Sequence, residues 1–249
     1  MGRRLVALAA ADPQLTVTAA LESPGHPLLG QDAGSVAGSG PLGVALSSEL
    51  TAAVDVVIDF SQPAATETIV ETCRRASTRL VVATTGLGPE QIQRLRTASQ
   101  QIALLWSPSM SLTVNLTMKL CQVAAAALAD KDADVEILER HHRFKEDAPS
   151  GTALKFGEII SQSIGQSQER HGRSGRPGKR PHAEIGYHAI RIGDNPGEHT
   201  ILFGMLGETI ELTVRATNRD CYALGALAAA KFLAGKPPRL YGMNDVLGL

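Results

Sequence analysis

Residues 139–153 carry the densest set of reactive side chains in the chain. They follow a short apolar run that predicts a buried strand, and a helix is predicted to begin directly after them with Ser150 as its N-cap. The groups that this strand, loop and helix start could bring together are the side chains of His141, His142 and Lys145 and the backbone N–H groups of Gly151 and Thr152. Such a set can hold an anionic substrate and pass it a proton.

Each part of this stretch also has a simpler interpretation. Neighbouring histidines often serve as hydrogen-bonded structural residues, because histidine has many roles in proteins. The Pro-Ser-Gly-Thr sequence at 149–152 is a common way to begin a helix. A metal site is not predicted, because adjacent side chains on a strand point to opposite faces and the chain has no HExxH or CxxC motif.

The stretch as a whole is much more specific than its parts. It contains His141-His142, Lys145 and the run Asp-Ala-Pro-Ser-Gly-Thr-Ala at 147–153. Further motifs are spread along nearly the whole chain: Asp59-Phe60-Ser61 with Pro63, Thr84-Thr85-Gly86, Ser107-Pro108 with Met110-Ser111 and Asn115, Gly197-Glu198-His199-Thr200, and Asp245-Val246-Leu247. In content and order these motifs resemble those of the 4-hydroxy-tetrahydrodipicolinate reductase family.

The resemblance implies an NADH- or NADPH-dependent reduction of 4-hydroxy-tetrahydrodipicolinate to tetrahydrodipicolinate, in the diaminopimelate route to lysine. It implies that His141 donates or accepts a proton and that Lys145 is a second proton donor. It assigns binding of the dicarboxylate substrate to His142, Gly151 and Thr152. A homo-oligomer, specifically a tetramer, is also implied.

Composition fits an ordinary globular protein. The chain has 249 residues, 43% hydrophobic and 20% charged, with a formal net charge of -1. Neither nucleic acid nor a membrane is indicated as a partner, and no apolar run is long enough to span a bilayer. Three scattered cysteines, Cys73, Cys121 and Cys221, favour reduced thiols, and the expected location is cytoplasmic.

The N-terminal segment predicts half of a nucleotide-binding unit. Residues 1–10 have helical spacing, and residues 15–22 predict a strand that ends at Glu22, whose carboxylate would accept hydrogen bonds from the adenosine ribose. In the family a strand and a Gly-rich loop precede a Met-Gly-Arg sequence, so Gly2 matches the last glycine of that loop. We expect a start codon upstream; a true loss would leave a sheet edge unpaired and the pyrophosphate without backbone donors.

The next residues define the rest of the expected cofactor site. Strands alternate with helices up to residue 106, which predicts a Rossmann-like parallel sheet with ligands at the carboxyl ends of its strands. Ser23 stands where some family members have an arginine for a 2′-phosphate, which favours NADH unless Arg3 or Arg4 supplies that charge. By resemblance the loops that line the nicotinamide contain Ala83, Thr84 and Thr85, and Ser107, Pro108, Ser109 and Met110.

The remaining segments indicate a second domain. Residues 1–111 and 220–249 are predicted to form the dinucleotide-binding domain, and residues 112–219 an α+β domain with a mixed sheet for substrate binding and tetramerisation. Ser23 to Leu50 is expected to be a loop, and Ser61 to cap the helix that begins near Pro63. In the helix predicted from Thr113, an apolar stripe indicates core packing, formed by Leu116, Leu120, Val123, Ala127 and Leu128.

Three other functions remain open from the sequence. A different amino or keto acid dehydrogenase would share the nucleotide-binding half but not the His-His, Lys and Pro-Ser-Gly-Thr set. A non-catalytic paralogue acting as a binding or scaffold protein would be consistent with an incomplete nucleotide site. An RNA-binding role could use the basic residues Arg170, Arg173, Arg176, Lys179 and Arg180, but no aromatic side chain is interleaved for base stacking, and a solvated flexible loop is expected.

Overall fold

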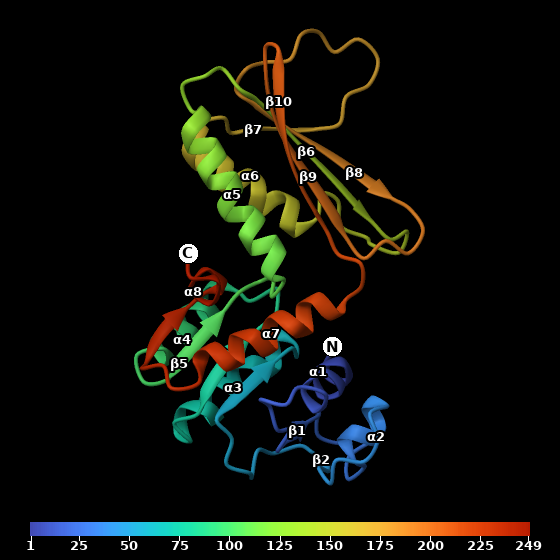
Figure 1. Cartoon of the computed structure of the whole chain (residues 1–249), viewed down its shortest axis with the longest axis vertical. Helices are drawn as coiled ribbons and strands as arrows, with labels where there is room; N and C mark the ends of the chain where they lie inside the picture. The colour runs from blue at the N-terminus through green and yellow to red at the C-terminus, as the bar shows by residue number, and fades with distance from the viewer. The chain divides into compact units, whose positions relative to one another are not determined.

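The structure is a computed structural model that describes residues 1–249 and divides into two compact units. Unit 1 contains Met1–Leu112 and Asp220–Leu249, and unit 2 contains Thr113–Arg219 (Figure 1). Unit 1 therefore takes both ends of the chain, and unit 2 is formed by its middle.

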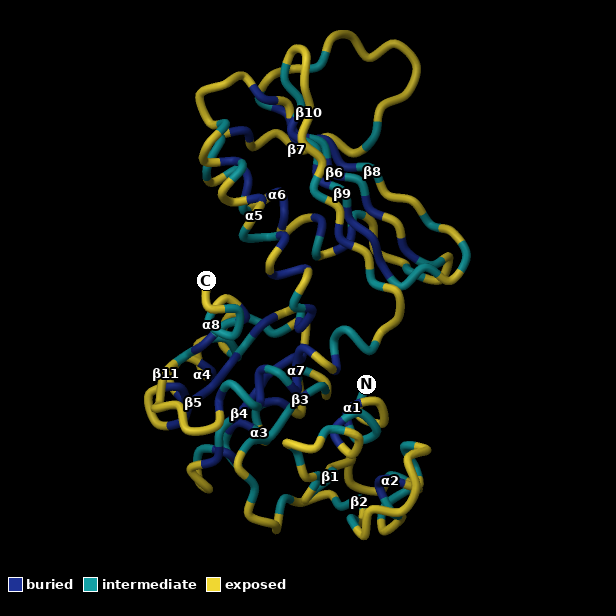
Figure 2. Tube along the Cα trace, viewed as in Figure 1, coloured by how far each residue is buried: buried dark blue, intermediate teal, exposed yellow.

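A four-stranded parallel sheet forms the centre of unit 1. Its strands, in order across the sheet, are β11 (Arg239–Tyr241), β5 (Ala103–Trp106), β4 (Arg79–Val82) and β3 (Val56–Asp59). The central strands β4 and β5 are almost wholly buried, as Figure 2 shows, because both faces of a parallel sheet are covered. The predicted parallel sheet is confirmed.

Helices cover both faces of this sheet. Helices α1 (Gly2–Ala10) and α7 (Asp220–Leu233) share a core with Val81 and Leu105, whereas α3 (Pro63–Arg75) and α4 (Pro89–Ala98) share another with Leu80 and Leu104. Helix α8 (Met243–Leu247) follows β11. Successive side chains of β4 and β5 point to opposite faces of the sheet, so each layer of helices packs on its own hydrophobic core.

The segment between α1 and β3 differs from the prediction. The sequence predicts a strand over 15–22 and a loop over 23–50. The structure has only β1 (Ala20–Leu21), which pairs in parallel with β2 (Leu46–Ser47), and the short helix α2 (Ala33–Ala37) between them. Residues 15–19 lie outside β1, whose two residues pair with the two residues of β2. Helix α2 begins after Asp32, whose carboxylate accepts from the N–H groups of Ser35, Leu42, Gly43 and Val44.

The N-cap of α3 also differs by one residue. Gln62, not Ser61, holds the capping position, and its side chain makes no cap bond. The N–H of Ser61 instead donates to the buried carboxylate of Asp59 at 2.8 Å, and the Thr66 hydroxyl donates to the other oxygen at 2.8 Å. Asp59 therefore ties the end of β3 to the first turn of α3, a connection that local capping rules do not predict.

Helix α7 and the loop after β5 touch at a glycine. A Cβ placed on Gly225 would overlap the carbonyl oxygen of Met110. We expect Gly225→Ala to destabilise the protein by about 1–3 kcal/mol, because backbone must move to admit the methyl group. Thermal unfolding would show this as a lowered Tm. Gly242→Ala is the control, since a Cβ on Gly242 meets no atom within 4 Å, and an equal loss of stability in both variants would contradict the packing argument.

The cysteines and the apolar character of the helices complete the description of the fold. All three cysteines are free, with Cys73 and Cys121 buried and Cys221 half-buried. Burial raises the pKa of the Cys73 and Cys121 thiols to about 12, so both are protonated and unreactive at neutral pH. None of the helices combines the length and the apolar character needed to cross a membrane.

Unit 2 is a five-stranded mixed sheet covered on one face by two helices (Figure 1). The strands, in order across the sheet, are β10 (Glu208–Arg215), β9 (Glu198–Met205), β6 (Asp134–His141), β8 (Glu184–Arg191) and β7 (Gln168–His171). Strand β6 is central and runs parallel to β8 but antiparallel to β9. The predicted mixed sheet is therefore confirmed.

The covering helices are α5 (Leu112–Leu128) and α6 (Gly151–Ile164). Their core contacts correct the predicted stripe on α5. Val114, Cys121 and Ala125 face the sheet, whereas the stripe residues Leu116, Leu120 and Val123 are 40%, 45% and 57% exposed. Ala127 is exposed as well, and only Leu128 of the stripe packs against the core. The stripe prediction is wrong because α5 is apolar on more than one face, so periodicity alone cannot identify the buried one.

Charged side chains fasten the basic segment 170–180 to the sheet. Arg173 donates to both carboxylate oxygens of Glu136 at 3.0 and 2.9 Å and also contacts Glu184, while Arg180 contacts Glu136 at 3.0 Å and Asp134 at 2.6 Å. Two of the five basic residues are thus committed to carboxylates. The expectation of a freely solvated loop is wrong for these two, and their pairing argues against the RNA-binding alternative.

Candidate active site

The central strand β6 presents two polar residues on its buried face. Glu139 and His141 are two positions apart, so both point toward the helices, and they are 1% and 8% exposed. The Oε2 atom of Glu139 lies 2.6 Å from Nδ1 of His141. A carboxylate can only accept, so Nδ1 carries a proton and donates it to this hydrogen bond.

Glu139 is the centre of a larger network. Arg191 of β8 forms a bidentate pair with it, with Nη1 2.7 Å from Oε2 and Nη2 2.8 Å from Oε1. The backbone N–H of Ser150 donates to Oε1 at 3.1 Å. Burial alone would raise the pKa of Glu139, but the hydrogen bonds from Arg191 and His141 outweigh it and hold the pKa below its ordinary value. Glu139 is therefore a carboxylate with two donors on each oxygen.

The other nitrogen of His141 faces a glycine. A Cβ on Gly197, which has φ +150, would come within 3.0 Å of His141 Nε2, so only glycine leaves this side of the ring uncrowded. Burial lowers the pKa of His141 more than Glu139 raises it, while Lys145 and Arg191 lower it further. The neutral ring, protonated at Nδ1, presents Nε2 as a proton acceptor, and after protonation Nε2 becomes a donor.

A second histidine packs against the first. His199 of β9 lies opposite Glu139 in the sheet, and its ring meets the His141 ring edge-on with centroids 5.2 Å apart. Its Nε2 is 2.9 Å from the hydroxyl oxygen of Ser150, which also accepts from the N–H of Ala153 as the N-cap of α6. Burial lowers the pKa of His199 to about 4, so this ring is neutral at pH 7. The predicted Ser150 cap is confirmed.

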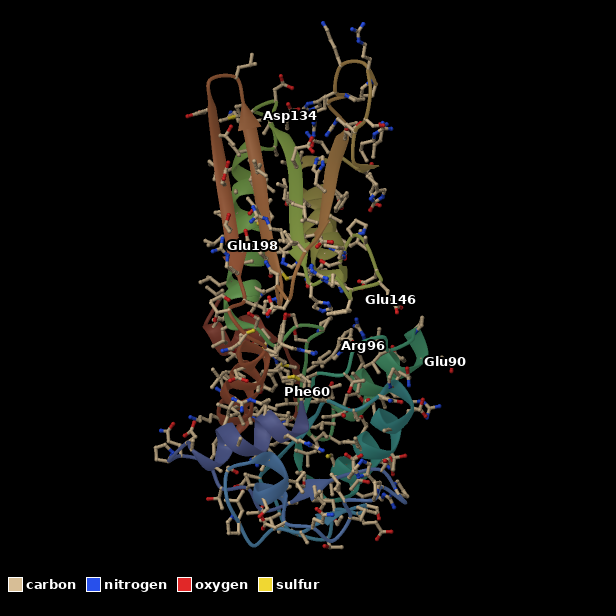
Figure 3. The ribbon with its side chains drawn as sticks, turned by 90° about the vertical axis from the view of Figure 1, so that its right-hand side faces the viewer. Phe60, Glu90, Arg96, Asp134, Glu146 and Glu198 are labelled. Atoms are coloured by element: carbon tan, nitrogen blue, oxygen red, sulfur yellow. The ribbon has the colours of Figure 1, made fainter.

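The loop after β6 carries the ammonium group. Lys145 Nζ donates to Asp147 Oδ1 at 2.7 Å, and the Lys145 side chain is 22% exposed. The backbone carbonyl of Asp147 accepts from Arg191 Nη2 at 2.6 Å. Arg191 thus contacts both Glu139 and the residue that holds Lys145. In Figure 3, Glu146 marks this loop and Glu198 marks the start of β9, at the end of the sheet where β6 stops.

The three predicted substrate-binding residues lie in the same region of unit 2. His142 follows β6 directly, is half-buried, and its Nδ1 is buried without a hydrogen-bond partner. Gly151 and Thr152 open α6, where the first N–H groups of a helix have no intrahelical partner and favour an anion. Gly151 is exposed and a Cβ there would meet nothing within 4 Å. The five predicted substrate and catalytic residues therefore lie at the end of β6, in the loop that follows it and at the start of α6.

The predicted nicotinamide loops follow neighbouring strands of unit 1. Thr84 follows β4, and its hydroxyl is buried without a hydrogen-bond partner, which suits a group that awaits a ligand. Ser107 follows β5 and donates its hydroxyl to the carbonyl of Ser109 at 2.7 Å, while Met110 is buried. These residues fit a nucleotide at the carboxyl ends of parallel strands. The other residues of these loops, Ala83, Thr85 and Pro108, lie beside them in the chain.

The predicted ribose site lies after β1. Glu22 accepts from the N–H of Ser23 at 2.8 Å, and this bond holds the pKa of Glu22 below its ordinary value, with a smaller contribution from Arg3. Arg4 is committed to Asp220 through a bidentate pair at 2.8 and 2.6 Å. Of the two arginines that could meet a 2′-phosphate, Arg3 is therefore the one that is not engaged by Asp220. Gly2 lies at the first position of α1, with nothing within 4 Å of a Cβ there.

Comparison with known proteins accounts for both units. The model described as "Dihydrodipicolinate reductase, N-terminus" matches residues 1–110, and the model described as "Dihydrodipicolinate reductase, C-terminus" matches residues 113–247. The chain belongs to the dihydrodipicolinate reductase family. The resemblance found in the sequence motifs is thereby confirmed.

Individual relatives agree with this family. The 4-hydroxy-tetrahydrodipicolinate reductase of Rhodopirellula baltica is 57% identical over 259 residues, covering 100% of this chain and 92% of that protein. The 4-hydroxy-tetrahydrodipicolinate reductase of Alkalilimnicola ehrlichii is 46% identical, and the match covers 100% of this chain and 95% of that protein. The solved dihydrodipicolinate reductase from Paenisporosarcina sp. TG-14 shows the same fold, with a TM-score of 0.79 at 24% sequence identity. The match covers 98% of this chain and 94% of that protein.

The family establishes the reaction. As a dihydrodipicolinate reductase, this chain is an NADH- or NADPH-dependent oxidoreductase that reduces 4-hydroxy-tetrahydrodipicolinate in lysine and diaminopimelate biosynthesis. The predicted enzyme class, reaction and cofactor type are confirmed. The alternatives of a scaffold paralogue and of a different dehydrogenase are set aside by these matches.

Sequence reasoning did not identify three members of the reductase's polar network. Glu139, Arg191 and His199 all contact the predicted site, yet none was assigned a role from the sequence. The two-residue spacing of Glu139 and His141 on a strand was an available signal, because it places both side chains on one face. Arg191 and His199 can be assigned to the site only when the strand pairing is known, because His141 lies opposite Arg191 and Glu139 opposite His199.

Proposed function

We propose that unit 2 binds the dicarboxylate substrate and supplies the protons of the reduction, with His141 and Lys145 as the catalytic residues. The observation that carries this proposal is the connected chain from His141 through Glu139, Arg191 and Asp147 to Lys145. One network thus holds both proton-bearing side chains beside a helix N-terminus. Such an arrangement suits an anionic substrate that must also be protonated.

The substrate's carboxylates define the binding roles. The N–H groups of Gly151 and Thr152 and the Thr152 hydroxyl bind one carboxylate at the start of α6. His142 binds the other and gives its unpaired Nδ1 a partner. The relative from Paenisporosarcina is bound to dipicolinate, itself a dicarboxylate, which supports this ligand class.

Proton transfer follows from the state of each group. Loss of water from the 4-hydroxy ring leaves a conjugated C=C–C=N system, to which NADH or NADPH would supply hydride when bound. His141 holds its own proton toward Glu139 and exchanges a second proton with the substrate at Nε2. Lys145, a cation beside Asp147, donates the proton with which the 4-hydroxyl group leaves as water, and the proton that His141 takes from the ring returns to the ring after hydride addition.

Unit 1 is proposed to hold the nucleotide. Glu22 binds the adenosine ribose, and Gly2 lies near the phosphates. The nicotinamide is bound by Ala83, Thr84, Thr85, Ser107, Pro108, Ser109 and Met110. NADH is the proposed preference, because Ser23 offers no charge to a 2′-phosphate and Arg4 is paired with Asp220. A homotetramer in the cytoplasm is proposed from the family resemblance.

The cofactor preference gives a direct test. With freshly generated 4-hydroxy-tetrahydrodipicolinate, we expect the purified protein to oxidise NADH with a kcat/KM about tenfold above that for NADPH, because a missing charge partner costs about 1–2 kcal/mol. Ser23→Arg should raise kcat/KM for NADPH and leave that for NADH nearly unchanged. Higher activity with NADPH in the unaltered protein would overturn the preference. It would point to Arg3 as the 2′-phosphate partner, which Arg3→Ala would test.

A further inference from the structure

We propose that Glu139 is a positioning residue of the reductase: it fixes the tautomer of His141 that leaves Nε2 free for proton transfer, and it ties that ring to the helix start that binds the substrate. This inference rests on the proposed role of His141. It adds a residue that touches neither substrate nor cofactor in that proposal. Arg191 is the cation that keeps Glu139 ionised in its buried site.

The hydrogen-bond pattern determines the tautomer. Oε2 of Glu139 accepts from His141 Nδ1 at 2.6 Å and from Arg191 Nη1 at 2.7 Å, and Oε1 accepts from Arg191 Nη2 and the Ser150 N–H. Arginine and the peptide N–H can only donate. His141 is the one partner that could switch between donor and acceptor. As long as residue 139 is a carboxylate, the neutral His141 ring must carry its proton on Nδ1.

The same bonds connect the ring to the substrate side. The Ser150 N–H that Glu139 holds belongs to the residue that caps α6, and the next two residues are the proposed carboxylate ligands Gly151 and Thr152. One carboxylate therefore positions the proton-transfer ring and the anion-binding helix start together. A displacement of Glu139 would affect both.

The charges around His141 come from several elements. Glu139 lies on its own strand, Arg191 on β8, His199 on β9 and Lys145 on the following loop. His199 is neutral at pH 7, and Arg191 and Lys145 are cations that disfavour a charged His141. Glu139 is the only anion among these neighbours. It therefore sets how readily Nε2 gains a proton.

Glutamine at position 139 tests the inference because it replaces one oxygen by an NH₂ group. If that group takes the Oε1 position, it faces the N–H donors of Arg191 and Ser150. If it takes the Oε2 position, it faces Arg191 and His141, and His141 can respond by moving its proton to Nε2. In the second arrangement, fewer N–H donors point at the NH₂ group of the glutamine without an acceptor. Glu139→Gln is therefore expected to shift the neutral ring to the Nε2–H tautomer.

The experiment compares ¹⁵N NMR of the histidine rings in the full-length protein with turnover. For Glu139→Gln we expect the His141 signals to change tautomer, its pKa to fall by about one unit or more, and kcat to fall roughly 100-fold. The pH limb governed by His141 should move to lower pH, because removal of the anion disfavours the protonated ring. Glu139→Asp keeps an acceptor-only carboxylate and should retain the Nδ1–H tautomer and much of the turnover.

Glu136→Gln is the matched control. Glu136 lies on the same strand, pairs with Arg173 and Arg180, and accepts from His188 at 2.7 Å, but it does not contact His141. Its turnover per folded molecule and its His141 signals should match those of the unaltered protein. If Glu139→Gln leaves the tautomer and pKa of His141 unchanged, the inference is overturned. If His141→Ala retains full turnover, the proposed proton role fails instead, and the NMR result still decides what Glu139 does to the ring.

Discussion

His141→Ala is expected to lower kcat by about 10²- to 10⁴-fold, the range that general acid–base catalysis supplies. The fold should persist, because Glu139 keeps its bonds to Arg191 and Ser150 after the ring is removed. In the unaltered protein, the pH limb governed by His141 should lie below 6.5, since burial lowers the pKa of this ring. That limb should be absent from the profile of the variant.

Circular dichroism and steady-state kinetics across pH would test this expectation. His182→Ala provides the control, because His182 has a 59% exposed side chain that is paired only with Asp132 at 3.0 Å. It should leave both kcat and the pH profile unchanged. A folded His141→Ala variant with normal turnover would remove His141 from the proton-transfer role.

Lys145→Ala should have the second large effect, a loss in kcat of roughly 10²- to 10³-fold with a raised KM. The ammonium group donates to the carboxylate of Asp147 at 2.7 Å and lowers the pKa of that carboxylate. Its removal would leave the Asp147 carboxylate without its ion-pair partner, beside a site that must accept a dicarboxylate. The missing proton donor lowers kcat and this repulsion raises KM, so both lower kcat/KM.

Lys145→Arg separates these two contributions. Arginine keeps the positive charge but does not release a proton in the pH range of the assay, so KM should recover while kcat stays low. Lys155→Ala is the control, since Lys155 pairs with Glu158 on the exposed side of α6. Recovery of kcat in Lys145→Arg would show that Lys145 acts through its charge and not as a proton donor.

The sequence predicted the residues of the substrate site well because they are contiguous. A strand end, a polar loop and a capped helix start are local features, and Ser150 does cap α6 as its type and position indicate. The parallel sheet of unit 1 was equally predictable, since buried strands such as β4 alternate with helices along the chain. Family motifs then supplied the reaction.

Features that depend on sheet register or on the choice between apolar faces were not predictable in this way. Arg191 reaches Glu139 only because β8 lies parallel to β6 with His141 opposite Arg191. The exposure of Leu116, Leu120 and Val123 depends on which side of α5 meets the sheet. The ion pairs of Arg173 and Arg180 could not be predicted without knowing where Glu136 lies in the folded sheet. In each case the deciding contact joins residues far apart in sequence.

The central place of β6 in its sheet has a consequence for local stability. Strand β6 is bonded along both edges, to β8 and to β9, so its amide hydrogens exchange with solvent only when a large part of unit 2 opens. The loop that carries Lys145 has no such pairing, so we expect its amide hydrogens to exchange faster. Glu139, which is paired on both edges, therefore belongs to the most persistent part of the unit, whereas His141, at the end of the strand, is paired with β8 alone.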